Sequence, residues 1–218
     1  MSRESRTYDD PCGIARALDR IGERWGLLIV RELLLGPKRF TQLRRGLAGA
    51  SPNVISQRLK QLEENGIVRR TMLDPPASVA VYELTPRGRD LEPVLLELGR
   101  WGSRAQVTAH CELSVDALMI ALMTTFDPAR ARGVDAEYAV VLDGERFRVG
   151  VRDGRLEVVR GRCERPVASL ESDVTTLREL VFGARSLAEA IGSGSMRVAG
   201  DRRAASRFLK LYAVPQPA

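Results

Sequence analysis

The stretch SPNVISQRLKQLEENGIV, residues 51–68, constrains this chain most, because it marks both ends of one helix. Ser51 is a favoured N-cap residue, and Pro52 suits the first helical turn, where its missing N–H leaves no bond unmade. Gly66 can adopt the left-handed backbone conformation that ends a helix. The pattern predicts a helix from Pro52 to about Glu64.

The two sides of this helix differ in chemistry. Apolar residues recur at i, i+4 and i+7 and fall within about 60° of one another, which is typical of a core-facing stripe. The opposite side presents amide, hydroxyl and amine groups, which can bond to base edges in the DNA major groove. Two roles remain open for Val54, which are contact with a thymine methyl group and support of the turn. We therefore predict a recognition helix that binds DNA through its polar side. The alternative is a polar side that is only solvated. The apolar stripe is Ile55, Leu59 and Leu62, and the polar side is Asn53, Ser56, Gln57 and Lys60.

The elements around this helix follow a recognisable order. Two helices, at about 12–21 and 24–35, precede a short third helix for which Thr41 is a candidate N-cap. Two strands, 67–73 and 79–85, flank the turn DPPAS, and one long helix runs from Pro86 through Trp101. Helix, turn, helix, hairpin and helix is the order of a winged helix-turn-helix.

Positive charge is concentrated in this half of the chain. The net charge is +6, and the segment 36–70 holds eight basic residues against Glu63 and Glu64. A basic segment of this kind favours a polyanionic partner, although a solvated basic surface is the alternative. We predict contacts to double-stranded DNA from Arg39, Thr41, Arg44, Arg45, Ser51, Asn53, Val54, Ser56, Gln57, Arg58, Lys60, Arg69 and Arg70.

The second half has a different pattern. An amphipathic helix is predicted over 112–128, and two Asp-Gly turns within 136–161 predict a three-stranded antiparallel meander. Further strands at 167–172 and 195–201 alternate with helices at 173–183, 186–194 and 203–212. The fold class is therefore α+β, with a helical first domain and an antiparallel sheet covered by helices in the second.

Composition excludes several kinds of site. Three widely spaced cysteines without a CxxC pair argue against a disulfide scaffold and a zinc site, so no metal and no cofactor is expected. The single histidine, His110, would have to serve any triad alone, so we expect no catalytic role for it and no enzyme. The longest aliphatic runs are far too short to span a bilayer, and residues 1–11 are polar, so a soluble cytoplasmic protein is expected.

The segments ALDRIGERW, LLIVRELLLGPKRFTQLRR, SPNVISQRLKQLEENGIV and YELTPRG resemble the HxlR-type winged-helix regulators of bacteria. This resemblance implies a homodimer, built from the first and last helices, on a pseudo-palindromic operator with recognition helices about 34–36 Å apart. We expect a repressor. Family wings commonly carry a basic residue after the proline pair, whereas this chain has Ala77 there, so wing anchoring is expected from Arg69 and Arg70. Cys12 stands where some members sense oxidants or electrophiles, which makes a redox sensor the alternative.

The tail SDVTTLRELVFGARSLAEAIGSGSMRVAGDRRAASRFLKLY resembles the sterol-carrier-protein fold. This resemblance implies an apolar small-molecule effector, with a structural module or a lipid carrier as alternatives. We expect a disordered segment 1–10, a DNA-binding and dimerisation domain over 11–107, and a ligand-sensing domain over 112–214. Each residue proposed for the ligand pocket could equally belong to the core: Met119, Leu122, Met123, Phe126, Leu177, Leu180, Val181 and Phe182.

Overall fold

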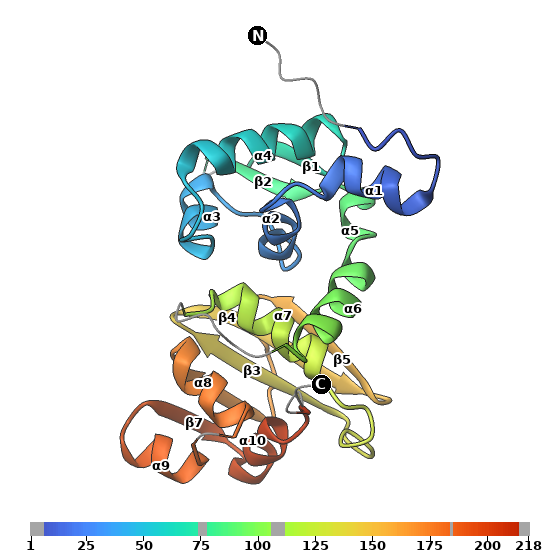
Figure 1. Ribbon diagram of the computed structural model, residues 1–218. Helices are drawn as coiled ribbons and strands as arrows, with labels where there is room; N and C mark the ends of the chain where they lie inside the picture. The colour runs from blue at the N-terminus through green and yellow to red at the C-terminus, as the bar shows by residue number, and fades with distance from the viewer. Residues whose placement is uncertain (1–6, 74–77, 106–111, 184, 214–218) are drawn as a thin grey trace. The chain divides into compact units, whose positions relative to one another are not determined.

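The computed structural model describes residues 7–73, 78–105, 112–183 and 185–213 (Figure 1). The chain forms two compact units, Met1–Leu95 and Leu96–Ala218. The division falls inside one helix, α6 (Glu92–Gly102). The junction expected from the sequence, between residues 107 and 112, and the single histidine, His110, lie outside the described residues.

The first unit is a winged helix-turn-helix, as predicted (Figure 1). Its antiparallel hairpin pairs Val68 with Leu84 and Met72 with Ala80. A shared core of buried aliphatic side chains joins the helices to this hairpin, including Ile29, Leu43 and Ile55. The elements are α1 (Gly13–Ile21), α2 (Gly26–Leu33), α3 (Phe40–Gly46), α4 (Pro52–Glu64), β1 (Val68–Met72), β2 (Ala80–Leu84), α5 (Pro86–Arg89) and α6.

Two local predictions in this unit are wrong. Thr41 does not cap α3, because the helix begins at Phe40, two residues earlier than predicted, with Arg39 as its N-cap residue. The long helix predicted from Pro86 is two helices, α5 and α6, separated after Arg89. Pro93 gives the physical reason, since a proline at that position cannot donate to the carbonyl four residues earlier and is tolerated only in a first turn.

The second unit contains a five-stranded sheet in the order β5-β4-β3-β6-β7. β3 and β6 are parallel, and the other neighbours are antiparallel. The predicted Asp-Gly turns are confirmed, since Asp143-Gly144 and Asp153-Gly154 all have positive φ. The α+β class is confirmed; the elements are α7 (Val115–Thr125), β3 (Ala136–Leu142), β4 (Glu145–Arg152), β5 (Arg155–Arg160), β6 (Ala168–Ser172), α8 (Val174–Val181), α9 (Leu187–Gly192), β7 (Met196–Gly200) and α10 (Arg202–Leu209).

Helix α7 differs from the amphipathic helix expected there. Its polar residues Asp116 and Thr124 are buried along with its apolar ones, so α7 has no solvated face of the expected kind. Arg160 of β5 pairs with Asp116, which allows a carboxylate to be buried in this helix. Among the described residues, no helix is long and apolar enough to cross a membrane.

Candidate nucleic-acid interface

Helix α4 has the ends and the buried face that its sequence predicts. The Ser51 Oγ accepts a hydrogen bond from the Val54 N–H at 3.3 Å, and Gly66 has a φ of +67° just beyond the C-terminus. Ile55, Leu59 and Leu62 are 0%, 1% and 2% exposed, so they fix the helix to the core. The rotation of α4 about its own axis is therefore determined.

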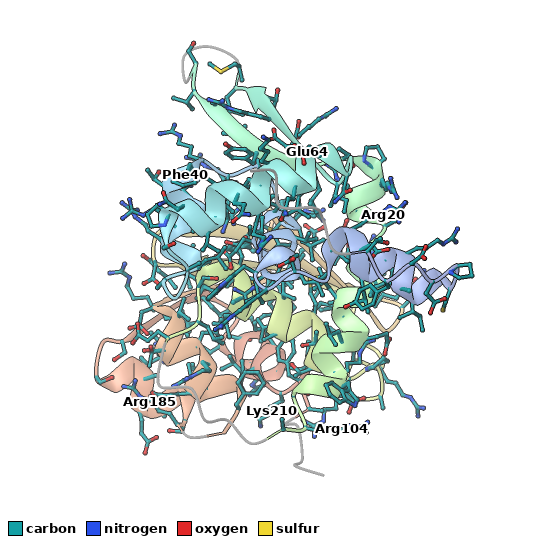
Figure 2. All side chains as sticks on the ribbon, turned by 45° about the horizontal axis from the view of Figure 1, so that its top comes forward. Arg20, Phe40, Glu64, Arg104, Arg185 and Lys210 are labelled. Atoms are coloured by element: carbon teal, nitrogen blue, oxygen red, sulfur yellow. The ribbon has the colours of Figure 1, made fainter. Side chains whose placement is uncertain are left out.

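This rotation leaves the predicted polar side in solvent. Asn53, Ser56, Gln57 and Lys60 are all exposed. The Lys60 ammonium lies 3.8 Å from the Glu64 carboxylate one turn later, a weak exposed contact that leaves the amine free to move. Figure 2 shows α4 between the labels of Phe40 and Glu64, with side chains projecting outward.

Arg58 was predicted to contact DNA, but the structure turns it toward its own domain. Its Nη2 lies 2.8 Å from the Glu23 carboxylate, and its Nη1 donates to the side chain of Gln61. The Arg58 side chain is only 16% exposed. Arg58 therefore ties α4 to the segment before α2, and a DNA contact from Arg58, which would have to break this pair, stays a prediction. Val54 is half-buried, which favours the supporting role left open for it.

The helix before the turn presents basic side chains to solvent. Arg39, Thr41, Arg44 and Arg45 are exposed on or beside α3. None of these arginines forms an ion pair within the described part of the chain. Their guanidinium groups therefore remain available for phosphate oxygens, for which arginine offers planar bidentate geometry.

Lys38 belongs to the same basic segment but faces inward. Its Nζ lies 2.8 Å from the Glu32 carboxylate, and the two side chains are 7% and 0% exposed. The backbone of Lys38 also exchanges two hydrogen bonds with Tyr82 of β2, at 2.9 and 2.8 Å. Lys38 thus joins α2 to the wing and adds nothing to the surface charge.

The wing arginines differ from each other. Arg69 lies 2.8 Å from the Glu83 carboxylate across the hairpin, whereas exposed Arg70 has no ion-pair partner among the described residues. Of the eight basic residues in 36–70, the structure pairs Lys38, Arg58, Lys60 and Arg69 with carboxylates. The unpaired basic surface is therefore narrower than the sequence suggested.

Cys12 is exposed and is the N-cap residue of α1. Its backbone N–H donates to the Asp10 carboxylate at 2.8 Å, and its carbonyl accepts from the Arg16 N–H at 3.0 Å. The predicted redox residue is thus accessible to a small oxidant.

The residues predicted to line a ligand pocket lie mainly in the core of the second unit. Met119, Leu122, Leu177, Leu180 and Val181 are buried, and Met123, Phe126 and Phe182 are half-buried. Two hollows of this unit, of about 480 and 410 Å³, are lined by other, mostly polar residues. The larger one lies on the sheet, over Glu137, Arg148, Gly150 and Glu157 among others. A pocket lined by the eight predicted residues stays a prediction.

Sequence reasoning missed two polar features of the second unit: the half-buried Arg160 with its buried partner Asp116, and the buried hydroxyl of Tyr212. Arg160 Nη2 lies 2.6 Å from Asp116, and Arg160 also pairs with Glu145. Burial lowers the pKa of Arg160, but Asp116 and Glu145 raise it more, so the guanidinium stays charged. The Tyr212 hydroxyl is buried without a hydrogen-bond partner in the described part of the chain, and burial raises its pKa well above the ordinary value. Alternation in β5 could have indicated Arg160, since its position falls on the core face of the strand.

Each half of the chain matches a known protein family. Residues 20–109 match the HxlR-like helix-turn-helix model, and residues 104–218 match the alkyl sulfatase C-terminal model. A helix-turn-helix-type transcriptional regulator of Synechocystis, sll1512, is 36% identical over 104 residues, which are 48% of this chain and 77% of the relative. The second match names an alkyl sulfatase domain where the sequence had suggested a sterol carrier.

Two solved structures are similar to separate parts of the chain. The redox regulator HypR in its oxidized form is 31% identical, over 44% of this chain and all of HypR, with a TM-score of 0.41. The sec-alkylsulfatase Pisa1 from Pseudomonas is 21% identical over 46% of this chain, with a TM-score of 0.43, and the chain spans only 16% of Pisa1. The chain belongs to the HxlR-like helix-turn-helix family of DNA-binding transcriptional regulators and, through its second half, to the alkyl sulfatase C-terminal family.

Proposed function

We propose that the protein regulates transcription as a homodimer on a pseudo-palindromic DNA site, with α4 in the major groove. One observation carries this proposal: the exposed face of α4 holds Asn53, Ser56, Gln57 and Lys60, while its other face is locked in the core. Amide side chains match adenine edges, and the lysine amine can donate to guanine. The unpaired Arg39, Arg44 and Arg45 would hold the DNA backbone.

The experiment is a gel shift with duplexes selected from a random pool by the wild-type dimer. Gln57→Ala and Lys60→Ala should each weaken specific binding by about 1–3 kcal/mol and relax preference at a small number of positions. Arg178→Ala on α8 serves as the control, because Arg178 is equally an exposed helical cation but lies in the second unit. Unchanged affinity and unchanged preference in both α4 variants would remove α4 as the recognition helix.

Dimerisation through the first and last helices is supported by exposed apolar side chains. α1 exposes Ile14 at 72% and Leu18 at 40%. α6 exposes Val94, Leu98 and Trp101, which are spaced i, i+4 and i+7 and so share one face. Exposed apolar rows of this kind are typical of protein contacts. Ile14→Ser and Trp101→Ser should each shift the protein toward monomer in analytical ultracentrifugation, and an unchanged dimer would contradict the assignment.

The second unit would bind a hydrophobic effector that changes DNA affinity. The support is the match to the alkyl sulfatase C-terminal family, whose name points to alkyl compounds, together with the sterol-carrier resemblance, which implies an apolar ligand. The pocket would lie among Met119, Leu122, Leu177 and the other residues predicted for it. Native mass spectrometry of the purified chain should detect a retained apolar molecule. An empty protein whose melting temperature is unmoved by 1-dodecanol would argue for a structural module.

Redox sensing through Cys12 is the second candidate, because this cysteine is exposed and the similar protein HypR is a redox regulator. Under this alternative, diamide would release the selected duplex from wild-type protein, and Cys12→Ser would abolish the release. Release by diamide in the Cys12→Ser variant would exclude it.

A further inference from the structure

Helix α10 of the second unit separates apolar from basic side chains. Its apolar side packs on β6 and β7, and it is buried, since Phe208 is 0% and Leu209 is 7% exposed. At about 100° per residue, the basic side chains fall on the opposite side of the axis, within about 140° of one another. All of them are exposed, and Lys210, labelled in Figure 2, directly follows the helix. The basic face of α10 consists of Arg202, Arg203, Arg207 and Lys210.

The charge of this basic face is not balanced along the chain. The sequence holds no aspartate or glutamate after Asp201, whose carboxylate accepts backbone hydrogen bonds as the N-cap of α10. Within the described ranges, none of the four basic residues forms an ion pair. Arg132 adds a fifth exposed cation, because its carbonyl accepts a hydrogen bond from the Arg207 guanidinium at 3.1 Å. Residues 106–218 as a whole hold 16 basic and 15 acidic residues, so the positive charge is concentrated at this place.

The stability of the helix does not account for the basic face. Arg202 and Arg203 lie in the first turn of α10, where the positive end of the helix dipole opposes cations. Arg203 and Arg207 are spaced i, i+4, and like charges at this spacing repel each other. Only Arg207 and Lys210, at the C-terminal end, are favoured by the dipole. The first-turn arginines therefore indicate a contact outside the helix.

We propose that the basic face of α10 binds the phosphate backbone of the DNA that the first unit recognises. The arginine guanidinium offers planar, paired donors that match phosphate oxygens, and closely spaced cations suit a polyanion. The two units belong to one chain, so DNA held by the first unit raises the local concentration of phosphate at the second. This inference rests on the DNA binding proposed above, and it adds contacts that have no base preference of their own.

An anionic membrane fits this face less well than DNA does. An amphipathic helix that binds a membrane buries its apolar side in the lipid. The apolar side of α10 is already buried in its own unit, through Phe208 and Leu209. Only the cations remain for an external partner, and phosphate contacts to DNA require nothing more.

The test measures binding of the full-length protein to a duplex that the wild type selects from a random pool, at several salt concentrations. Arg202→Ala/Arg203→Ala/Lys210→Ala should reduce the slope of log affinity against log salt by about two to three, since each lost phosphate contact lowers it by about one. Base preference in the selected pool should stay unchanged. Arg202→Lys/Arg203→Lys/Lys210→Arg keeps the charges and should retain the wild-type slope. Arg207 is left in place because it also bonds to the Arg132 carbonyl.

The matched control is Arg162→Ala/Arg165→Ala/Arg178→Ala. These arginines are exposed after β5 and on α8, and they form no ion pair among the described residues, so the control removes the same charge from elsewhere on the unit. The control should keep the wild-type slope. An equal loss of slope in both triple variants would mean that only net charge matters, and it would overturn a contact through α10. Circular dichroism melting checks folding, and alanine in place of Arg202 and Arg203 should not lower the melting temperature.

The outcomes separate this inference from the function on which it rests. If the wild type selects no duplex, the proposed function fails and the α10 contact with it. If the wild type binds and the α10 triple variant keeps the wild-type slope, only the α10 contact fails. If the wild type binds phosphatidylserine vesicles, and the α10 triple variant loses that binding while its DNA slope is unchanged, the basic face belongs to a membrane contact and the inference is overturned.

Discussion

The buried ion pair between Glu32 and Lys38 offers a sharp test of how the DNA-binding unit is held together. The Lys38 Nζ lies 2.8 Å from Glu32, and neither side chain is more than 7% exposed. Lys38→Met keeps most of the stem and removes the charge, which leaves a buried carboxylate. Removing one partner of a buried pair costs about 3–5 kcal/mol. Since Arg31 still reaches the other Glu32 oxygen at 2.9 Å, we expect a cost near the lower end of that range.

The assay is calorimetric and urea-induced unfolding of the full-length chain. A loss of about 3 kcal/mol in a unit of this size lowers its melting temperature by roughly 12–24 °C. Arg69→Met is the matched control, because the Arg69–Glu83 pair is exposed on its arginine side and should contribute at most about 1 kcal/mol. Glu32→Met/Lys38→Met should recover much of the loss, since it removes both charges.

The reasoning is refuted if Lys38→Met costs less than about 1 kcal/mol, as an exposed pair would. It is equally refuted if the double variant is less stable than Lys38→Met alone. Either result would mean that the two charges are solvated rather than buried.

Three further predictions follow from single contacts. Tyr212→Phe removes a buried hydroxyl without a described partner, so it should stabilise the second unit by about 1 kcal/mol in urea unfolding. Because burial raises the pKa of Tyr212, the wild type should lose stability as pH rises above about 10, the unfolded value, and the variant should lose less; an identical alkaline profile would contradict this. Gly88→Ala would place a Cβ 2.1 Å from the Ile67 carbonyl oxygen, so we expect the free energy of unfolding to fall by about 1–3 kcal/mol. An unchanged free energy of unfolding would show that the backbone moves aside at no cost. Arg58→Ala should lower stability while leaving base preference in selected duplexes unchanged, in contrast to Gln57→Ala, and a changed preference would return Arg58 to the DNA interface.

The elements of this fold could be predicted because their signals are local. Ser51, Pro52 and Gly66 mark the ends of α4 within one stretch of chain, and each Asp-Gly pair specifies its own hairpin turn. Where a prediction failed locally, one residue was decisive, as Pro93 was for the break between α5 and α6. The polar face of α4 followed equally from helical periodicity alone.

The partners and the solvent exposure of the charged side chains could not be predicted in the same way. Arg58 and Lys60 sit two residues apart on α4, yet Arg58 turns to Glu23 and Lys60 faces solvent. The helix over 112–128 was expected to be amphipathic, but Asp116 within it is buried, and Arg160, 44 residues away, pairs with it. Local periodicity does not relate residues so far apart in the sequence, so it does not indicate which charged side chains will pair.

The sequence by itself determined most of the order of the elements and the chemistry of the face that α4 presents. Those features depend on turns, caps and periodicities that act over a few residues. Only the tertiary structure decided which arginines remain exposed and unpaired for phosphate. Ion pairing and burial depend on what another part of the chain places within about 4 Å, and that is a property of the folded molecule.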